Sequence, residues 1–299
     1  MIEAFKTVVE KHEKITILAT QVPTGDTLGT GLGIYAVLKS FGKQVEICNL
    51  DKKLPNHLDF LPHFARIKRQ IDFDNSLIIT CGSASTNIVG FDLSLREIVP
   101  IVDGTSTSML AYGLLKDDFV IDQVSATCFY VGLVTETQNF STLNLTQNVF
   151  RVASELVAFG VDISMVNKNL MQRKSLSSLR ILSRALDSLV LSSDAQIASM
   201  VLTKESLEKT GADARDVLGI IEHGMALATV KIAILLVEFE EKIEVSFRSD
   251  RANVAELARH FGGGGQLMAS GFSTKIVDLN RLLDEIEIEI KNRRLVNEL

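Results

Sequence analysis

The sequence predicts an α/β protein of two domains, an N-terminal parallel sheet covered by helices and a smaller mixed α+β domain. In the first half, short apolar runs alternate with segments of helical periodicity, a pattern typical of parallel strands buried on both faces. In the second half, two long β patterns follow each other across a short acidic turn, as they do in a hairpin. The length of 299 residues suits two domains of ordinary size.

Four strands and four helices are expected in the first half. The strands are short and almost wholly apolar, and they span residues 15–19, 45–48, 77–80 and 98–102. The helices carry apolar residues three and four positions apart, and they span residues 27–41, 106–116, 122–134 and 145–159. In a parallel sheet, ligands bind at the carboxyl ends of the strands. Motifs that directly follow these strands are therefore the first candidates for a functional site.

The domain boundary is expected around a leucine-rich helix at residues 175–189. We assign residues 1–165 to the first domain, 166–192 to a linker helix and 193–299 to the second domain. The expected strands of the second domain span residues 195–202, 229–238 and 242–248. Its expected helical segments span residues 204–209, 213–222, 254–261 and 279–290.

The composition excludes several classes of protein. No apolar run approaches the ~20 residues that a membrane-spanning helix needs, so no membrane partner is expected. The N-terminus lacks a basic stretch followed by an apolar core, which argues against a signal peptide. The net charge of −6 argues against long duplex DNA as a partner, because proteins that wrap it normally carry a basic surplus. Any nucleic-acid ligand should be short and bound by a local basic patch.

The three cysteines indicate a reducing compartment. Cys48, Cys81 and Cys128 lie far apart on apolar stretches, so neither a disulfide framework nor a zinc site is expected. We therefore expect free thiols and a cytoplasmic location.

A run of four glycines is the strongest candidate for a binding segment. It consists of Gly262, Gly263, Gly264 and Gly265, and Gln266 follows it directly. Consecutive glycines expose backbone N–H groups that can hold an anion. The alternative is a flexible linker, but the run stands between an amphipathic helical segment and the apolar segment 269–272, which argues against it.

Carboxylates follow two of the predicted strands and end one predicted helix. Asp26 lies in Pro23-Thr24-Gly25-Asp26, just after the first strand, and Asp103 directly follows the fourth strand. Glu136 comes at the end of the helix that begins near residue 122. Taken alone, Asp26 is also a good residue for opening a helix.

In this order, the motifs resemble those of DHH-family phosphoesterases with a DHH-associated C-terminal domain. In that family, the first motif has a histidine and two aspartates, and this chain has Thr20, Thr24 and Asp26 at those positions. The family's third strand ends in an aspartate that bridges two metals, and Gly82 stands there in this chain.

The remaining motifs show the same kind of exchange. The family's Asp-His-His triplet corresponds here to Asp103, Gly104 and Thr105. Glu136 replaces a metal-binding aspartate, and Gln266 replaces the histidine after the glycine run. The matches run in order through nearly the whole chain and most resemble the bacterial nanoRNase/pAp-phosphatase subgroup.

The resemblance implies a division of labour between the two domains. In that subgroup, the N-terminal domain holds two manganese ions that activate water. The C-terminal domain holds the phosphate and the base of the substrate. Members often pair through the N-terminal domain, so the resemblance also implies a homodimer.

Counting ligands against this pattern predicts that the metal site is lost. Two-metal cleavage needs anionic bridging ligands and full coordination shells for both ions. Asp26, Asp103 and Glu136 are too few, so no metal cofactor is expected, and any residual catalysis falls to these three. Two alternatives stay open: the carboxylates hold one Mg²⁺ or Mn²⁺ ion with several waters, or helix N-terminal amides and hydroxyls satisfy them.

The substrate-binding half is less changed than the metal-binding half. Arg248 can clamp a phosphate through two hydrogen bonds, although a surface charge at a strand end is the alternative. Ser249 and the glycine amides can supply further donors. Gln266 can donate an amide hydrogen, but it cannot become a cation.

The first hypothesis for function is therefore a degenerate DHH-type homologue. It would bind a nucleotide or short oligonucleotide in the cleft between the domains, with little or no hydrolysis. The alternative is an active metal-dependent phosphoesterase that uses Asp26, Asp103 and Glu136. A third hypothesis is a scaffold whose pockets bind nothing small.

Overall fold

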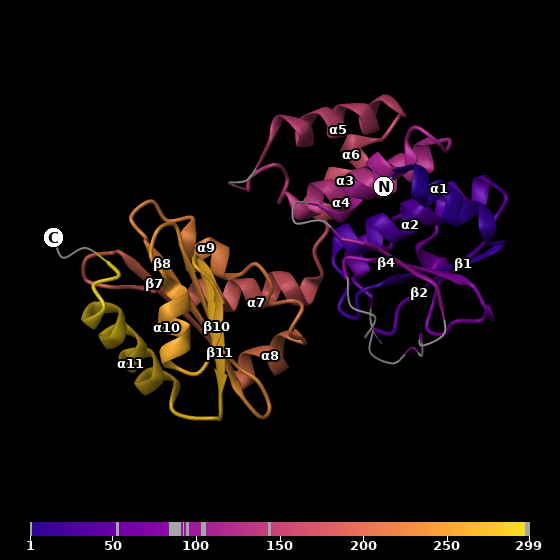
Figure 1. Cartoon of the computed structure of the whole chain (residues 1–299). Coiled ribbons are helices and arrows are strands. Elements are labelled where there is room, and N and C mark those ends of the chain that lie inside the picture. The colour runs from indigo at the N-terminus through magenta and orange to yellow at the C-terminus, as the bar shows by residue number, and fades with distance from the viewer. Residues whose placement is uncertain are drawn as a thin grey trace. The chain divides into compact units, whose positions relative to one another are not determined.

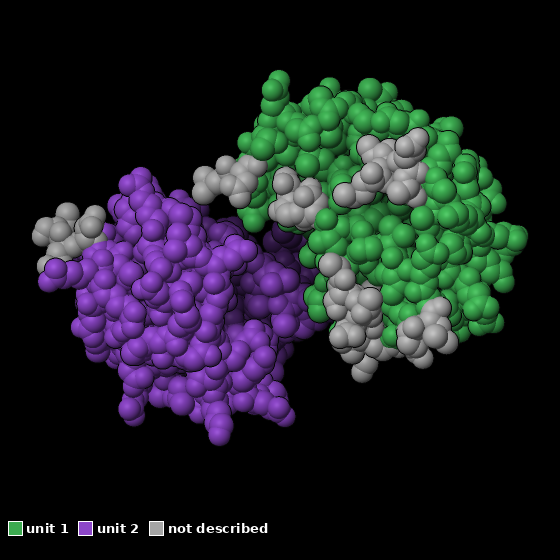
Figure 2. All heavy atoms as spheres, viewed as in Figure 1, with its two compact units in different colours: residues 1–173 green, residues 174–299 purple. Residues whose placement is uncertain are grey.

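The computed structural model describes residues 2–51, 54–83, 91, 93, 96–102, 106–142 and 145–296. The chain divides into two compact units, Met1–Arg173 and Lys174–Leu299, which are coloured separately in Figure 2. Each unit has its own sheet and its own hydrophobic core. The division falls within the segment assigned to the linker.

Unit 1 contains the expected parallel sheet. Its strands are β1 (Lys14–Ala19), β2 (Gln44–Cys48), β3 (Ile67–Lys68), β4 (Leu77–Cys81) and β5 (Ile98–Ile101). They lie in the order β3-β2-β1-β4-β5, and every neighbouring pair is parallel. The strand order reverses between β1 and β4, and in open parallel sheets ligands bind at the carboxyl ends of the strands beside such a reversal.

The helices of unit 1 form one core with the sheet (Figure 1). The α-helices are α1 (Ile2–Lys11), α2 (Gly25–Ser40), α3 (Thr107–Leu115), α4 (Gln123–Glu136), α5 (Gln147–Ala158) and α6 (Ile163–Asn167). Short helical turns also occur: η1 (Asn56–Leu58) and η2 (Phe64–Arg66) lie between β2 and β3, and the π-helical η3 (Lys168–Gln172) follows α6. The sheet side chains of this core include Ile15 and Ile17 of β1. Leu18 belongs to a smaller cluster with Phe91 and Leu93, so described coil residues contribute to the cover of the other face.

Unit 2 contains a mixed sheet of six strands. They are β6 (Val190–Leu191), β7 (Ile197–Leu202), β8 (Ile232–Glu238), β9 (Ile243–Ser249), β10 (Gly264–Gln266) and β11 (Ala269–Thr274). The order is β10-β11-β9-β8-β7-β6, in which only β7 and β8 are parallel. The antiparallel pairing of β8 with β9 confirms the predicted hairpin.

Helices pack on both faces of this second sheet. On one face, α10 (Val254–His260) and α11 (Leu279–Asn292) share a core with strand residues such as Phe247. The other core joins α7 (Leu176–Asp187), α8 (Lys204–Thr210) and α9 (Ile221–Met225) to residues such as Ala233. The α/β fold class predicted from the sequence is thus confirmed.

One helix of unit 2 was predicted wrongly. Residues 213–220 form turns, and only the five residues of α9 are helical beyond them. Gly219 has φ +81°, in the left-handed region that interrupts a helix. The hydroxyls of Ser175 and Ser177 also donate to the Asp216 carboxylate, which fastens this turn to the start of α7.

The remaining expectations from composition concern thiols and membranes. All three cysteines are free and buried. Burial raises the pKa of Cys48 to about 12, so its thiol is unreactive near neutral pH. Among the described helices, none combines the length and apolarity that a bilayer crossing requires.

Candidate functional site

Asp26 lies in the first turn of α2, just after β1 and next to the reversal of strand order. Its carboxylate is only 4% exposed and accepts three hydrogen bonds. The backbone N–H groups of Thr107 and Ser108 donate over 2.7 and 2.9 Å, and the Ser106 hydroxyl donates over 3.0 Å. Asp26 therefore binds the N-terminus of α3, where the helix dipole favours a negative charge.

The N-terminus of α2 is capped by a different residue. Thr24 accepts a hydrogen bond from the Thr27 amide, and the Thr27 hydroxyl accepts one from the Thr24 amide, which together form a capping box. The Thr20 hydroxyl lies 3.4 Å from the same Thr27 oxygen. Three threonine hydroxyls thus gather where the family pattern has a histidine and an aspartate.

Gly82 directly follows β4 and lies against Thr27 in the first turn of α2. It has φ +81°, and a side chain there would overlap the Thr27 methyl group. An aspartate at this position would have to displace Thr27 and adopt a strained backbone. The Thr27 methyl group therefore occupies the space that an aspartate side chain at position 82 would need.

Glu136 closes α4 at the same end of the unit. Much of this residue reaches solvent, yet partial loss of water around the carboxyl group raises its pKa. The Asp26 carboxylate raises the pKa of Glu136 further, so the structure brings these two predicted residues within electrostatic range of each other. Asp103, the third predicted carboxylate, lies outside the described residues, as do Gly104 and Thr105.

In unit 2, Arg248 lies near the end of β9 and is already paired. Its Nε donates to Glu222 Oε1 over 2.9 Å, and its Nη1 donates to the Phe247 carbonyl over 3.0 Å. The side chain of Arg248 is 35% exposed, so part of the guanidinium remains open to solvent. Glu222 was not among the predicted site residues, because the sequence pattern makes it the last residue of a helix expected at 213–222.

The glycine run ends a helix and then forms an edge strand. Gly262 has φ +81°, and its amide donates to the Arg259 carbonyl, while the Gly263 amide donates to the Ala258 carbonyl. Gly264 and Gly265 belong to β10 and pair with β11. The expectation of an open cradle of glycine amides was thus wrong for the first two, because the C-terminus of α10 uses them.

Ser249 and Gln266 have different surroundings from each other. Ser249 is 8% exposed, and its hydroxyl accepts the amides of Arg251 and Ala252, so it stabilises a turn. Gln266 is exposed at the end of β10 and pairs with Ala269, which in turn pairs with Arg248. Directly paired residues share a face of the sheet, so Gln266 and Arg248 lie on one face, about 10 Å apart across two strand spacings.

Comparison with known proteins covers both units. Residues 194–292 match the family model of the DHHA1 domain. A relative from Thermus thermophilus, named bifunctional oligoribonuclease and PAP phosphatase NrnA, is 26% identical over 90% of this chain and 87% of its own length. The Bacillus subtilis protein of the same name is 24% identical over 89% of this chain and 91% of its own.

These matches extend the motif resemblance through both units. Over nearly its whole length, the chain is thus similar to DHH-family phosphoesterases, and its second unit matches the DHHA1 domain. A crystal structure of an exopolyphosphatase-related protein from Bacteroides fragilis has the same fold, with a TM-score of 0.84 and 23% identity, covering 98% of this chain and 96% of that one.

The expectation that this chain needs no metal cofactor was wrong. It followed from treating the chain as a protein that has lost its chemistry, whereas the relatives that match it over about nine-tenths of its length are named bifunctional oligoribonuclease and PAP phosphatase. The error has a physical reason. Ions such as Mg²⁺ keep several waters and bind substrate phosphates, so a short list of protein ligands does not exclude a cofactor.

The described residues nevertheless do not fit a paired metal centre by themselves. Both Asp26 carboxylate oxygens already accept hydrogen bonds from backbone amides of α3. Of the other two predicted carboxylates, Glu136 is the one that the structure describes near Asp26. Within the described ranges, no group of three or more histidine, cysteine, aspartate or glutamate side chains could hold a metal ion. The described residues alone therefore do not identify a complete set of cation ligands, and Asp103 lies outside them.

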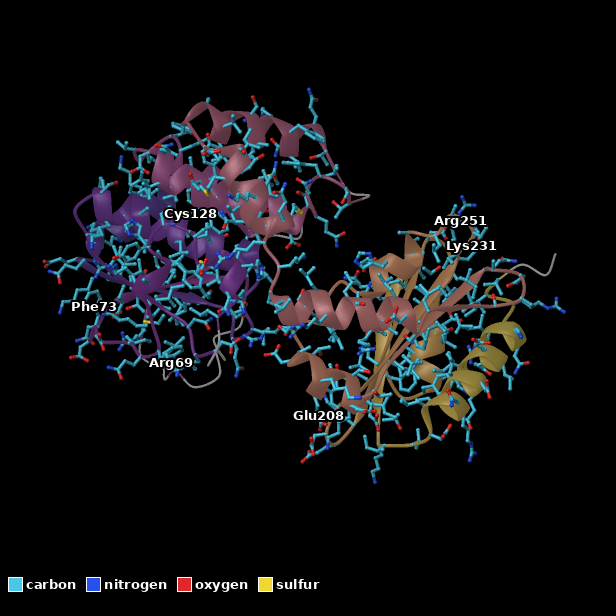
Figure 3. The ribbon with its side chains drawn as sticks, turned by 180° about the vertical axis from the view of Figure 1, so that it is seen from behind. Arg69, Phe73, Cys128, Glu208, Lys231 and Arg251 are labelled. Carbon is cyan, nitrogen blue, oxygen red and sulfur yellow. The ribbon has the colours of Figure 1, made fainter. Side chains whose placement is uncertain are left out.

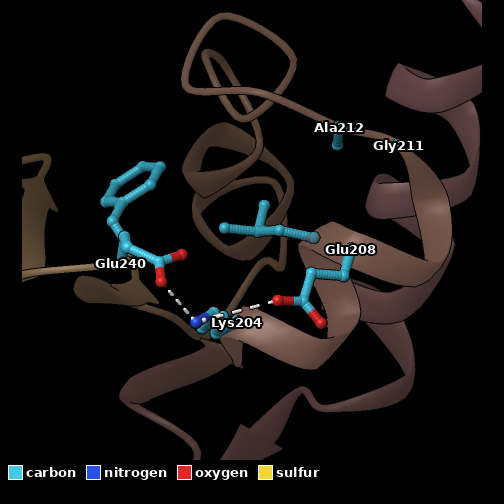
Figure 4. Close-up of a pocket in the computed structure, with 7 residues that line it drawn as sticks. Lys204, Glu208, Gly211, Ala212 and Glu240 are labelled. Carbon is cyan, nitrogen blue, oxygen red and sulfur yellow. Dashed lines mark hydrogen bonds and ion pairs between the residues drawn. The ribbon is translucent and has the colours of Figure 1, made fainter.

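A separate pocket of about 370 Å³ lies on unit 2 (Figure 4). Leu207, Ala212 and Phe239 supply its apolar lining. At its rim, the Lys204 ammonium lies 2.7 Å from Glu240, with Glu208 on its other side. None of the predicted site residues lines this pocket.

Proposed function

We propose that this chain is a phosphoester hydrolase that acts on a nucleotide or a short oligonucleotide and requires Mn²⁺ or Mg²⁺. One observation carries the proposal: the similarity to relatives named oligoribonuclease and PAP phosphatase runs through about nine-tenths of this chain and spans both units. A resemblance confined to one unit would support only one half of such an enzyme. The net charge of −6 supports a short ligand over long duplex DNA.

The two candidate regions suggest separate tasks. We propose that Arg248 and Gln266, which share a sheet face, bind the phosphate and the neighbouring part of the substrate. Ser249 and Gly262–Gly265 shape that region by fixing the turn before α10 and the edge strand after it. Asp26 positions α3, and Glu136 provides a carboxylate at the carboxyl end of the first sheet.

Assembly and location remain further proposals. We propose a homodimer and a cytoplasmic location, in keeping with the three buried free thiols. We also keep residues 1–165 and 193–299 as the proposed functional domains, joined by residues 166–192.

A second candidate function is nucleotide binding without turnover. It is favoured by the three hydrogen bonds that satisfy the Asp26 carboxylate inside the protein. A group that is already bound by two helix amides is a poor ligand or base for further chemistry. Binding without turnover would leave the sheet face of unit 2 as the functional surface.

One assay separates the two functions. The purified chain is incubated with pAp, or with a 5′-phosphorylated RNA dinucleotide, in Mn²⁺, in Mg²⁺ and in EDTA. Hydrolysis requires cation-dependent turnover on the order of 1 s⁻¹. Calorimetric binding without product in any cation favours the second function and overturns the first.

A matched pair of variants excludes a contaminating nuclease. Arg248→Ala should lower turnover or raise KM. Arg281→Ala removes an arginine of the same kind, which pairs through Nε with Glu285 over 3.0 Å on α11, and should change neither. Equal activity in both variants would show that the hydrolysis does not use Arg248.

A further inference from the structure

The cation best placed to bind phosphate in unit 2 already has an anionic partner. Glu222 Oε1 accepts a hydrogen bond from Arg248 Nε over 2.9 Å. Both partners reach solvent, with 35% of the Arg248 side chain and 57% of the Glu222 side chain exposed. An incoming anion could therefore exchange with Glu222 without unfolding any element.

The position of Glu222 is fixed by the packing of α9. Gly224 sits so close to the sheet that an added Cβ would lie 3.2 Å from Ala233 Cβ and 3.5 Å from Ala198 Cβ. Ala233 is the direct cross-strand partner of Arg248. The helix therefore rests on the strand beside Arg248, and Glu222, two residues before Gly224, reaches the guanidinium from there.

Neighbouring positive charges at this end of the sheet are also partly neutralised. Lys231 and Arg251 lie near each other in Figure 3, and both approach the Asp250 carboxylate, at 3.9 and 3.7 Å. Together with Arg248 and Glu222, these residues comprise three cations and two carboxylates. The local charge available to attract an anion is thus one, although three basic side chains are present.

We propose that Glu222 is an intramolecular competitor that lowers the affinity of Arg248 for phosphate. The inference rests on the proposed substrate site and adds a regulator of it. The anion and the Glu222 carboxylate compete for one guanidinium. The apparent Kd of the anion is therefore its intrinsic Kd divided by the fraction of molecules in which Arg248 is free of Glu222. An exposed ion pair of ordinary strength then weakens anion binding about two- to sixfold.

Binding of inorganic phosphate and of 5′-AMP to the full chain tests this directly. The Kd is measured by isothermal titration calorimetry at low ionic strength, where exposed charges are least screened. Glu222→Gln keeps an acceptor for Arg248 and removes the charge, so it should tighten both ligands about two- to sixfold. Glu285→Gln, which removes the same charge from the Arg281 pair on α11, is the matched control and should leave both Kd values unchanged.

A second variant separates competition from positioning. If Glu222 serves only to orient Arg248, Glu222→Ala should weaken binding, and Glu222→Gln should leave it unchanged. Competition predicts tighter binding in both variants and loss of that gain in the double variant Glu222→Gln/Arg248→Ala. An unchanged or weakened affinity in Glu222→Gln, or no binding in wild type and variant alike, overturns the proposal.

The outcome does not depend on whether the chain is a hydrolase. A gain in phosphate affinity without hydrolysis would uphold the role of Glu222 and refute the proposed reaction. Hydrolysis with no effect of Glu222 on binding would do the reverse.

Discussion

Replacing Asp26 by alanine should destabilise unit 1 strongly, even without any cation or substrate. The carboxylate accepts the amides of Thr107 and Ser108, and these residues are 4% and 0% exposed. Water cannot readily replace the lost acceptor at such positions. The two amides at the start of α3 would remain buried without a partner.

The magnitude follows from the number of orphaned donors. Each buried unsatisfied donor costs about 1–3 kcal/mol, so two donors give about 2–6 kcal/mol. The buried Ser106 hydroxyl also loses its acceptor, which adds to this cost. A loss of about 3 kcal/mol in a unit of this size lowers Tm by roughly 6–12 °C.

Differential scanning calorimetry of the full chain in EDTA measures this shift. The transition of unit 1 should move while that of unit 2 stays in place, because the two units have separate cores. Asp162→Ala is the control, since Asp162 caps α6 through one exposed hydrogen bond and should cost about 1 kcal/mol.

A different result would contradict the structural role of Asp26. If this carboxylate served only as a ligand or catalyst, its removal would leave the metal-free Tm unchanged or raise it, as active-site substitutions often do. An unchanged Tm in Asp26→Ala would therefore refute the contact with α3.

Two further predictions concern unit 1 and use thermal unfolding. Gly82→Ala should destabilise the unit by about 1–3 kcal/mol, because the added methyl overlaps Thr27 Cγ2 at a positive φ, and Thr27→Ser in the same chain should restore part of the loss. If the double variant is no more stable than Gly82→Ala, the overlap is not the cause. Burial, then Lys39 and Arg66, lower the pKa of His63 in the folded protein. As pH falls below the ordinary value of 6.5, the unfolded chain takes up a proton more readily than the folded one, so stability is lost. His63→Asn, which suits the φ of +63°, should flatten the fall in Tm between about pH 7.5 and 5.5, and an unchanged slope would contradict this.

The main strands could be predicted from sequence because their signal is local. Residues 15–19 and 77–80 are almost wholly apolar runs, and they form β1 and β4 within one residue at either end. The short strands β3, β6 and β10 were missed, since two or three residues carry no periodicity. In β10, the glycines suggested a loop, and only pairing with β11 makes them a strand.

The proximity of two candidate carboxylates was predictable from the sequence, but their hydrogen bonding was not. The sequence placed Asp26 and Glu136 at one end of a parallel sheet, and the structure brings them within electrostatic range. It could not show that α3 donates two amides to Asp26, because those donors lie more than 80 residues away. The hydroxyl-rich start of α3 at Ser106–Ser108 was the available signal, since such residues mark helix N-termini.

Several glycines that fix how the elements of this chain pack are distinct from the residues that could carry chemistry. A side chain at Gly29 would lie 2.5 Å from the Cys128 carbonyl, and one at Gly132 would overlap the Ser108 hydroxyl, so α2, α3 and α4 can meet only with glycine there. Gly263 meets the carbonyl of Gly271 in the same way in unit 2. Such close contacts fix how the helices and strands pack, independently of which side chains could carry chemistry, because replacing one of these glycines disrupts the packing around it. Likeness in fold therefore constrains where a substrate can bind more tightly than it constrains whether the substrate is cleaved, and measured turnover is the observation that bears on the second question.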